Sequence, residues 1–363
     1  MLAIGLMSGT SLDGIDAALI ETDGEGAVQP RCFVGVDYTG EERTLLMAAA
    51  EAAMAMPAPA MTEQMVAAEA LLTARHAEAV RTLLAEAALE PAAVGVIGYH
   101  GQTVAHRPDR GWTWQLGDGA GLAKATGIDT VFDLRSADVA AGGQGAPLLP
   151  VYHAALTAGL EPPVAVLNLG GVANVTLVGA NGALLAFDTG PANGLVDSWV
   201  EAETGERFDA DGALAGAGRV DEAVLTAMLD HPYFDQPPPK SLDRNDFTIQ
   251  PARGLALADG AATLTAFTAE SVALGLALLP ERPRRLLVAG GGRRNPTMLR
   301  MIEERTALLP EPADLFGWNG DAMEAEGFAY MAVRHLKGLP ISFPGTTGVA
   351  APMRGGVLAR APR

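Results

Sequence analysis

Apolar and polar positions alternate along this chain in blocks that predict strands and helices in turn. An apolar block at residues 2–7 is followed by a polar turn of small residues at 8–16 and by a second apolar block at 17–20. Two such blocks joined by a glycine-containing turn are typical of a β-hairpin. Residues 41–90 are rich in alanine, glutamate and leucine and predict two helices, which the sequence MPAPAM separates at 56–61.

The same alternation continues toward the C-terminus. Strand-like segments with glycine turns occur at 94–108, 128–150, 164–178, 184–200 and 284–305. An apolar helix is predicted at 261–279 and an amphipathic helix at 321–336, whereas 201–260 has few periodic signals. Strands that alternate with helices throughout a chain predict an α/β fold.

One pattern occurs twice. Segments 3–22 and 164–178 share the order apolar strand, small or polar glycine turn, apolar strand. Each opens one half of the chain, so two hairpins in two similar domains would face one another across a cleft. No repeat at the level of individual residues accompanies the pattern, which therefore does not establish two related domains by itself.

The composition is that of a globular protein without electrostatic support for binding nucleic acid or an anionic membrane. The 363 residues are 49% hydrophobic and 19% charged, with a net charge of −18, which allows a sizeable core and one or two domains. A single cysteine, Cys32, excludes an internal disulfide and fits a reducing compartment. No apolar run approaches the roughly 18 residues of a membrane span, and no basic segment precedes the first strand, so we expect a cytoplasmic protein.

The turn at 8–16 combines hydroxyl groups, glycines and two carboxylates. Glycines and small hydroxyl residues let backbone N–H groups approach an anion closely, so the turn can hold a phosphate without lysine. Asp13 and Asp16 would repel a phosphate unless a cation intervenes, which suggests Mg²⁺ held directly or through water. The alternative is a tight hairpin whose aspartate and serine side chains cap their own backbone.

Two later glycine turns, at 168–174 and 289–295, have the same two interpretations. The second follows a buried strand and contains three glycines, on which a flat ring or a phosphate can lie. The chain has no P-loop motif, and no G-x-G-x-x-G follows a strand, so neither a P-loop nor a Rossmann nucleotide site is expected. The motifs H-E-x-x-H and G-x-S-x-G are also absent.

A carboxylate ends the strand predicted within 184–200. Asp188 stands just before glycine and proline in the sequence FDTGPAN. An aspartate in that place can act as a general base near a bound ligand. It can equally cap the helix predicted at 193–200, and the local sequence does not decide between the two.

Polar residues follow two other predicted strands. His100 and Gln102 lie at the carboxyl end of a strand, where open α/β sheets bind ligands, although a lone histidine also serves structural purposes. Arg135 can bind a carboxylate in bidentate fashion. It can also form a structural ion pair with Asp133 or Asp138.

Taken in order, seven segments closely resemble the anhydro-N-acetylmuramic acid kinase family. They are GLMSGTSLDGID, GYHGQTVAHRP, LRSADVAAGGQGAPLLP, LNLGGVANVT, FDTGPANGLVD, VAGGGRRNP and DAMEAEGFA, and the likeness covers residues 4 to about 349. The family is similar in fold to the actin, hexokinase and Hsp70 superfamily of ribonuclease H-like type, in which two related domains hold ATP in the cleft between them. The resemblance implies a first ATPase-like domain at 1–132, with the tail from about 346 to 363, and a second at 133–345.

The resemblance also implies an activity, an ATP-dependent kinase of peptidoglycan recycling. It would use ATP and water to open the 1,6-anhydro ring of anhydro-N-acetylmuramic acid and to phosphorylate O6, giving N-acetylmuramic acid 6-phosphate and ADP. The implied cofactors are ATP and Mg²⁺, and the implied assembly is a homodimer in the cytoplasm, without nucleic acid or membrane as partner. Another sugar kinase of the superfamily and a non-catalytic ATP-binding module are the alternatives.

The family's motifs carry over to particular positions. They imply Asp188 as the catalytic base and Asp13 as a ligand of the metal, directly or through water. The implied substrate-binding residues are His100, Gln102, Arg135 and Glu324. The implied ATP-binding residues are Gly9, Thr10, Ser11, Leu12, Asp13, Gly14, Ile15, Asp16, Gly170, Gly171, Asn174, Gly290, Gly291, Gly292 and Asn295.

Two places depart from the family's pattern. Tyr99 stands where a small residue such as serine is expected, and we expect it to reshape the sugar pocket slightly. Leu242 and Asp243 stand where the family tends to have threonine and glycine, and we expect them to alter a loop over that pocket. Neither place includes Asp13 or Asp188, so the implied reaction is unaffected.

Overall fold

The computed structural model describes residues 1–242 and 246–362. The chain divides into two compact units: unit 1 consists of Met1–Ala158 and Ala322–Arg363, and unit 2 of Gly159–Asp321. These limits differ from the boundaries predicted at 132/133 and near 345, because helices at 150–156 and 323–336 belong to unit 1. The ATP cleft expected between two domains stays a prediction.

A mixed sheet forms the centre of unit 1. Its strands are β1 (Leu2–Ser8), β2 (Gly14–Thr22), β3 (Val28–Asp37), β4 (Val96–Arg107), β5 (Trp112–Leu116), β6 (Thr130–Phe132) and β12 (Val357–Ala359). Strands β1, β2 and β3 form an antiparallel meander, whereas β4 lies parallel to β1, and β6 lies parallel to β4. Strand β5 pairs antiparallel with β4, and β12 pairs antiparallel with β6.

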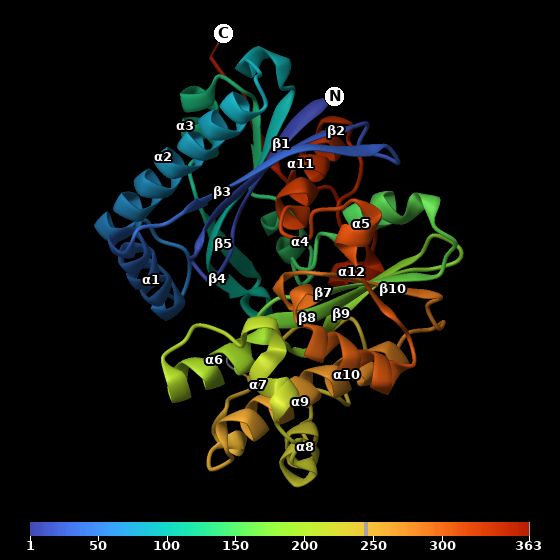
Figure 1. Ribbon diagram of the computed structural model, residues 1–363. Helices are drawn as coiled ribbons and strands as arrows, with labels where there is room; N and C mark the ends of the chain where they lie inside the picture. Colours follow the sequence, from blue (N-terminus) through green and yellow to red (C-terminus); the bar gives the residue numbers. More distant parts are fainter. Residues whose placement is uncertain (243–245, 363) are drawn as a thin grey trace. The chain divides into compact units, whose positions relative to one another are not determined.

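Helices cover both faces of this sheet (Figure 1). They are α1 (Gly40–Ala55), α2 (Glu63–Glu86), α3 (Gly119–Thr126), α4 (Ser136–Ala140), α5 (Pro150–Leu156), α11 (Met323–Leu336) and α12 (Pro344–Thr347). Ile4 and Leu6 of β1 enter the hydrophobic core formed with α1 and α2. Side chains alternate between the two faces of a strand, so Gly5 lies on the opposite face, against α11.

Helix α11 lies directly on the strands of unit 1. A Cβ at Gly5 would lie 1.7 Å from the carbonyl oxygen of Ala325, and a Cβ at Gly98 would lie 2.0 Å from that of Phe328. Only glycine permits this close approach of helix and sheet. The approach places Glu324, at the start of α11, in the same unit as the carboxyl end of β4.

Unit 2 is built around a second sheet. Its strands are β7 (Val164–Leu169), β8 (Val172–Val178), β9 (Leu184–Pro191), β10 (Arg285–Ala289) and β11 (Pro310–Pro312). Its helices are α6 (Asn193–Thr204), α7 (Ala213–Ala217), α8 (Glu222–Leu229), α9 (Leu257–Ala277) and α10 (Pro296–Thr306). Short 3₁₀ helices in the two units are Pro91–Ala93, Pro108–Arg110, Thr157–Gly159, Ala210–Gly212, Gln250–Ala252, Gly291–Arg294 and Ala313–Phe316.

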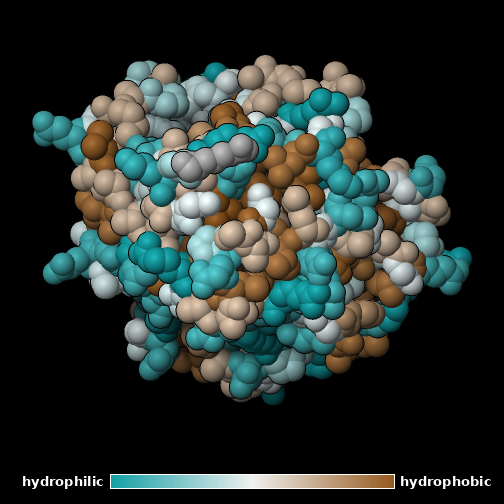
Figure 2. Space-filling view, turned by 90° about the horizontal axis from the view of Figure 1, so that it is seen from above, coloured by the Kyte–Doolittle hydropathy of each residue, from teal (hydrophilic) through white to brown (hydrophobic). Residues whose placement is uncertain are grey.

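The core of unit 2 forms around α9. Leu167 and Leu169 of β7 pack in one cluster with Leu264 and Phe267 of α9. Among the described residues, α9 is the helix whose length and composition would suit a membrane span, and 72% of its apolar window is buried inside the structure. We therefore assign its apolar character to the core. On the face that Figure 2 shows, hydrophobic and hydrophilic residues are interspersed.

The two sheets share one strand plan. The order β3-β2-β1-β4-β6 in unit 1 corresponds to β9-β8-β7-β10-β11 in unit 2. In each order two antiparallel pairs are followed by two parallel pairs. The α/β class and the two predicted hairpins, β1-β2 and β7-β8, are confirmed.

Candidate functional site

The first hairpin turn is fixed to β4 by side-chain hydrogen bonds. The register pairs Ser8 with Ile15, so residues 9–13 form the turn. The hydroxyl of Ser8 donates to Oε1 of Gln102 (2.5 Å), and Nε2 of Gln102 donates to the carbonyl oxygen of Gly9 (3.1 Å). Gln102, predicted to bind substrate, therefore supports the predicted phosphate turn.

Within this turn, one side chain anchors the loop and three face solvent. Leu12 has a φ of 56° and its side chain is only 6% exposed, in the core with α1 and α2. Thr10, Ser11 and Asp13 are exposed. The turn thus presents two hydroxyls and one carboxylate, while Leu12 holds its backbone in place.

His100 and Arg135 form a pair in unit 1. Nε of Arg135 donates to Nε2 of His100 (3.1 Å), so Nε2 is an acceptor and the proton is on Nδ1, which donates to the Gly101 carbonyl oxygen (2.8 Å). Burial and the neighbouring charge of Arg135 hold the pKa of His100 well below its ordinary value. The imidazole is therefore neutral at pH 7 and serves to orient the guanidinium.

The charge of Arg135 is offset by carboxylates of other elements. Its pKa is lowered to about 10 by burial, against the opposing effects of Glu324 and Asp138. Burial also raises the pKa of Glu324, an effect that the charge of Arg135 opposes. The hydrogen bonds of Arg135 go to His100 and to the Gly145 carbonyl oxygen (2.8 Å). The structure thus brings His100, Arg135 and Glu324 together in unit 1, and their role in substrate binding stays a prediction.

Besides its effect on the charge of Arg135, Asp138 has a structural role. Its Oδ1 accepts from the Gly145 N–H (2.7 Å), and its Oδ2 accepts from the hydroxyls of Thr347 (2.6 Å) and Ser342. This buried carboxylate therefore fastens the loop around Gly145 to the 342–347 segment.

The expected effect of Tyr99 on a sugar pocket stays a prediction. The ring of Tyr99 is fully buried in the core of unit 1, where it meets the ring of His76 edge-on at 4.8 Å. The side chain of Tyr99 fits because Gly117 has no side chain. A Cβ at Gly117 would lie only 2.3 Å from the Tyr99 hydroxyl oxygen. Of the second departure, Leu242 contacts Asp188 as described below, and Asp243 lies outside the described residues.

In unit 2 the second hairpin turn contacts the beginning of α6. The carbonyl oxygen of Gly171 accepts from the N–H groups of Ala192 (3.0 Å) and Gly194 (3.2 Å), and that of Gly170 accepts from the N–H of Asn193 (2.9 Å). The first N–H groups of a helix have no partner within the helix and can therefore bind an anion. Here the carbonyl oxygens of the turn accept from these groups instead. The turn and the helix start are therefore held together as one unit.

The glycine loop after β10 lies against the same turn. A Cβ at Gly290, where φ is 76°, would lie 2.5 Å from Oδ1 of Asn168, and a Cβ at Gly292 would lie 2.6 Å from Cβ of Leu169. At Gly291 the nearest atom would be 3.8 Å away. Gly290 and Gly292 thus allow close packing, whereas Gly291 faces an open space.

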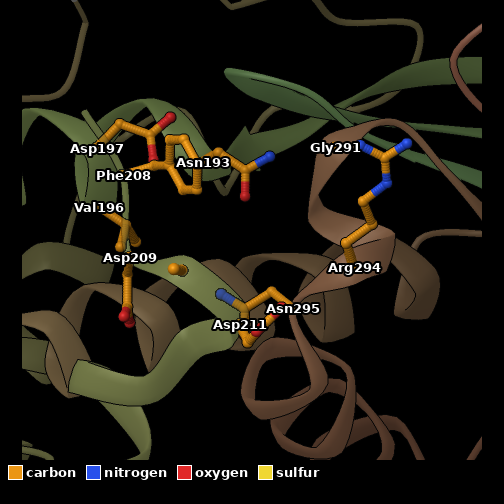
Figure 3. A pocket seen from close by; sticks show the side chains of 10 residues that line it. Asn193, Val196, Asp197, Phe208, Asp209, Asp211, Gly291, Arg294 and Asn295 are labelled. Carbon is orange, nitrogen blue, oxygen red and sulfur yellow. The ribbon is translucent and has the colours of Figure 1, made fainter. Parts of the chain in front are cut away.

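That space is a pocket of about 320 Å³ within unit 2 (Figure 3). It is lined by Asn193, Val196, Asp197, Phe208, Asp209, Ala210, Asp211, Gly291, Arg294 and Asn295. Gly291 and Asn295, two of the predicted ATP-binding residues, line it, and the carboxamide of Asn295 also caps α10 by accepting from the Met298 N–H (2.9 Å). Phe208, 60% exposed, contributes an aromatic ring that the sequence did not single out.

Arg293 fixes the loop that lines this pocket. Its side chain is buried, and it donates to Asp314 (2.7 Å), to Asp321 (2.8 Å) and to the carbonyl oxygen of Gly290 (3.1 Å). The loop conformation therefore depends on two carboxylates from a later part of the chain. Sequence reasoning missed this arginine, because the partners are separated from it by more than one element.

Asp188 lies in β9, opposite Asn174 of β8. Helix α6 begins after Ala192, which makes no side-chain cap, so the interpretation of Asp188 as the cap of this helix is wrong. Oδ2 of Asp188 accepts from the Leu242 N–H (2.8 Å). Burial raises the pKa of Asp188 to about 7, and the Leu242 hydrogen bond opposes this rise. A carboxylate with such a pKa can take up a proton near neutral pH.

The described residues also permit a test of the expected metal. No group of three or more His, Cys, Asp or Glu side chains that could hold a metal ion occurs in residues 1–242 and 246–362. Mg²⁺ in nucleotide sites is bound by one or two carboxylates together with phosphates and waters. The exposed carboxylate of Asp13, beside a turn of small residues, fits such a partial ligand set.

Comparison with known proteins gives matches along the whole chain. A family model described as anhydro-N-acetylmuramic acid kinase matches residues 1–361. The anhydro-N-acetylmuramic acid kinase of Rhizorhabdus wittichii is 68% identical over 99% of each chain, and that of Zymomonas mobilis is 54% identical over 98% of this chain and 99% of the relative. A solved structure, the activator of 2-hydroxyisocaproyl-CoA dehydratase from Clostridium difficile, is 12% identical with a TM-score of 0.47, over 93% of this chain and 96% of the other.

Proposed function

The chain belongs to the anhydro-N-acetylmuramic acid kinase family, and from this premise we propose how residues of its two units share the reaction. The protein is a kinase of peptidoglycan recycling that uses ATP and water to convert anhydro-N-acetylmuramic acid into N-acetylmuramic acid 6-phosphate and ADP. The roles of individual residues, the metal and the assembly are the parts proposed here.

The substrate's chemistry sets the requirements. A 1,6-anhydro sugar has no free 6-hydroxyl, so phosphorylation of O6 requires cleavage of the bond between C1 and O6. An oxygen of water bonds to C1, and the electron pair of the broken bond remains on O6. O6 then bonds to the γ-phosphorus, and the bond from that phosphorus to the bridging oxygen of ADP breaks. The proton lost by water needs a base.

We assign that base to Asp188. The observation that carries the assignment is a carboxylate in β9 with a pKa of about 7, whose Oδ2 is oriented by the Leu242 N–H. Near neutral pH such a group is partly ionised and has a proton affinity suited to general base catalysis. Among the described residues, the side chain that forms a hydrogen bond with Asp188 is that of Tyr233, which offers no basic group.

The pocket beside Gly291 is the proposed adenosine site. Val196, Phe208 and Ala210 offer apolar contact for a flat ring, and Asn193 and Asn295 offer amide groups. Its volume of about 320 Å³ lies within the usual range for small-ligand sites. Gly170, Gly171 and Asn174 are proposed to contribute to phosphate binding from the neighbouring hairpin.

Unit 1 is proposed to supply phosphate and sugar contacts. The turn around Thr10, Ser11 and Asp13 presents groups suited to a nucleotide phosphate and its counterion. Asp13 would hold Mg²⁺, which neutralises phosphate charge when bound. Arg135, oriented by His100, would bind the carboxylate of the muramic acid lactyl group, and Glu324 would accept a hydrogen bond from the sugar.

We propose a homodimer in the cytoplasm that has neither nucleic acid nor membrane as a partner. The net charge of −18 disfavours polyanionic partners.

Product analysis tests this function. Purified protein is incubated with ATP and anhydro-N-acetylmuramic acid in heavy-oxygen water, and the sugar product is analysed by mass spectrometry. We expect one ADP for each N-acetylmuramic acid 6-phosphate, with the heavy label on C1. Label in the phosphate, or turnover of ATP with other sugars of a panel and not with this one, would contradict the proposal.

A further inference from the structure

The segment from Tyr233 to Leu242 holds Asp188 by three hydrogen bonds. The Tyr233 hydroxyl donates to the carbonyl oxygen of Asp188. The N–H of Asp188 donates to the carbonyl oxygen of Lys240 (3.0 Å), and the N–H of Leu242 donates to Oδ2 (2.8 Å). The orientation of the Asp188 carboxylate therefore depends on the path of this segment.

Lys240 fixes that path. Its side chain is only 7% exposed, and Nζ donates to the carbonyl oxygens of Tyr233 (2.9 Å) and Phe234 (3.5 Å). Nζ also lies 4.5 Å from the centre of the Tyr233 ring, within the range of a cation–π contact. One ammonium group thus joins the two ends of the segment that contacts Asp188.

An aromatic cluster anchors the segment to the core of unit 2. The ring of Phe234 lies 5.7 Å from that of Phe247 and 5.8 Å from that of Phe267 in α9. The ring of Phe247 lies 5.4 Å from that of Phe267. Because Phe234 is held by these rings, the carbonyl groups that accept from Lys240 have a fixed position.

We propose that Lys240 is a positioning residue for the reaction: through the Tyr233 carbonyl and ring it holds the segment that orients Asp188. The proposal rests on the assignment of Asp188 as the base. Lys240 acts through the contacts of its ammonium group, which are those with the Tyr233 and Phe234 carbonyl oxygens and with the Tyr233 ring.

The direction of the effect on pH dependence follows from the hydrogen bond of Leu242. This N–H stabilises the ionised form of Asp188 and lowers its pKa, whereas burial raises it. If the segment loosens, the stabilising bond weakens and the pKa of Asp188 rises. Among the described residues, the other charges that act on the cluster are those of Asp235 on Lys240 and of Asp246 and Asp188 on Tyr233.

The test compares wild-type protein with Lys240→Met, which keeps a long side chain and removes the ammonium. We expect kcat to fall roughly 10- to 100-fold, since misplacement of a catalytic group by about 1 Å can cost on the order of 10²-fold. The acid limb of the pH profile of kcat/KM should move to higher pH. KM for ATP should stay unchanged, because other residues line the nucleotide pocket.

Three further variants separate positioning from a merely structural role. Lys240→Arg keeps a cationic donor and should restore part of kcat. Lys337→Met removes an ammonium that pairs with Glu25 in unit 1, and should match wild type. Tyr233→Phe removes the hydroxyl donor to Asp188 and keeps the ring, so it should shift the acid limb in the same direction with a smaller loss of kcat.

The outcomes decide between the proposals. The role of Lys240 is overturned if folded Lys240→Met has wild-type kcat and an unmoved acid limb. It is also overturned if Lys240→Met loses kcat and ATP affinity to the same extent and Lys240→Arg does not restore kcat. If Lys240→Met does not fold, an unmoved limb in Tyr233→Phe overturns it. If the wild-type acid limb is unrelated to Asp188, as shown by its persistence in Asp188→Asn, the assignment of the base itself fails.

Discussion

The hairpin turns of the two units differ, although the sheets that carry them share one strand plan. In unit 1 the turn at 9–13 is long, and it exposes Thr10, Ser11 and Asp13. In unit 2 the turn consists of Gly170 and Gly171, and their carbonyl oxygens accept from the first N–H groups of α6. One scaffold thus presents exposed polar groups in the first unit and a closed, glycine-only turn in the second.

Because of this difference, we propose unequal roles for the two turns. A carboxylate in an exposed turn can bind a counterion, whereas a turn whose carbonyls are occupied can offer only its remaining N–H groups. In unit 2 the pocket proposed for adenosine lies between the start of α6 and the loop at 291–295. The comparison therefore predicts a large effect of changes in the first turn and a small one in the second.

Among changes in the two turns and in the residues that accompany them, the largest effect is expected for Asp13→Asn. Without the carboxylate, turnover at a fixed Mg²⁺ concentration should fall on the order of 10²-fold or more, a typical cost of losing an electrostatic catalytic group. Because Asp13 is exposed, the free energy of unfolding should change by no more than about 0.5 kcal/mol.

Turnover as a function of Mg²⁺ concentration and thermal unfolding together check this. Asp109→Asn, at another exposed carboxylate of unit 1, is the control and should behave as wild type. If Asp13→Asn lost activity only in proportion to the folded fraction, the role of Asp13 would be structural.

Gly291→Val should weaken ADP binding at least about tenfold, equivalent to about 1.4 kcal/mol. The new side chain would project into the pocket, since the nearest atom to a Cβ there is 3.8 Å away. Calorimetric titration with ADP measures the affinity. Gly26→Val, where a Cβ meets no atom within 4 Å, is the control in unit 1. Wild-type affinity in Gly291→Val would exclude this pocket as the adenosine site.

Arg135→Lys should raise KM for the anhydro sugar about fivefold and leave KM for ATP unchanged. Lysine lacks the Nε group that donates to His100, and one such hydrogen bond contributes about 1 kcal/mol. Steady-state kinetics with each substrate varied in turn separates the two constants. A change in KM for ATP alone would show that Arg135 contacts the nucleotide and not the sugar.

The smallest effect is expected for Gly171→Ala. A Cβ at this position meets no atom within 4 Å, and alanine keeps both the N–H and the carbonyl that α6 uses. ADP affinity should change less than about twofold, within roughly 0.4 kcal/mol. A tenfold loss in calorimetric titration would show that the second turn contacts the nucleotide as closely as the first is proposed to do.

The sequence predicts those parts of the fold and site that depend on local pattern. The two hairpins, the paired helices within 41–90 and the apolar helix near 261–279 follow from periodicity, and the structure confirms them. The unit boundaries do not follow from it, because α11 returns to the first sheet by packing against Gly5 and Gly98. A glycine in a strand does not reveal which distant helix approaches it.

The surroundings of the candidate base show the same limit. Asp188 is visible in the motif FDTGPAN, but Tyr233 and Lys240 lie in the region of weak periodicity, and nothing local connects them with β9. The burial of Tyr99 is not visible in the sequence for a related reason, because it depends on the space at Gly117. Contacts between residues far apart in sequence decide both cases.

The pH dependence of kcat/KM in wild type and in Asp188→Asn tests the central claim most directly. The free-enzyme profile should fall as pH is lowered through about 7, because protonation removes the base. Asp188→Asn should lower kcat/KM by roughly 10²- to 10⁴-fold and remove this acid limb, while ADP still binds. Near-normal turnover in Asp188→Asn, or an acid limb that persists in it, would contradict the account.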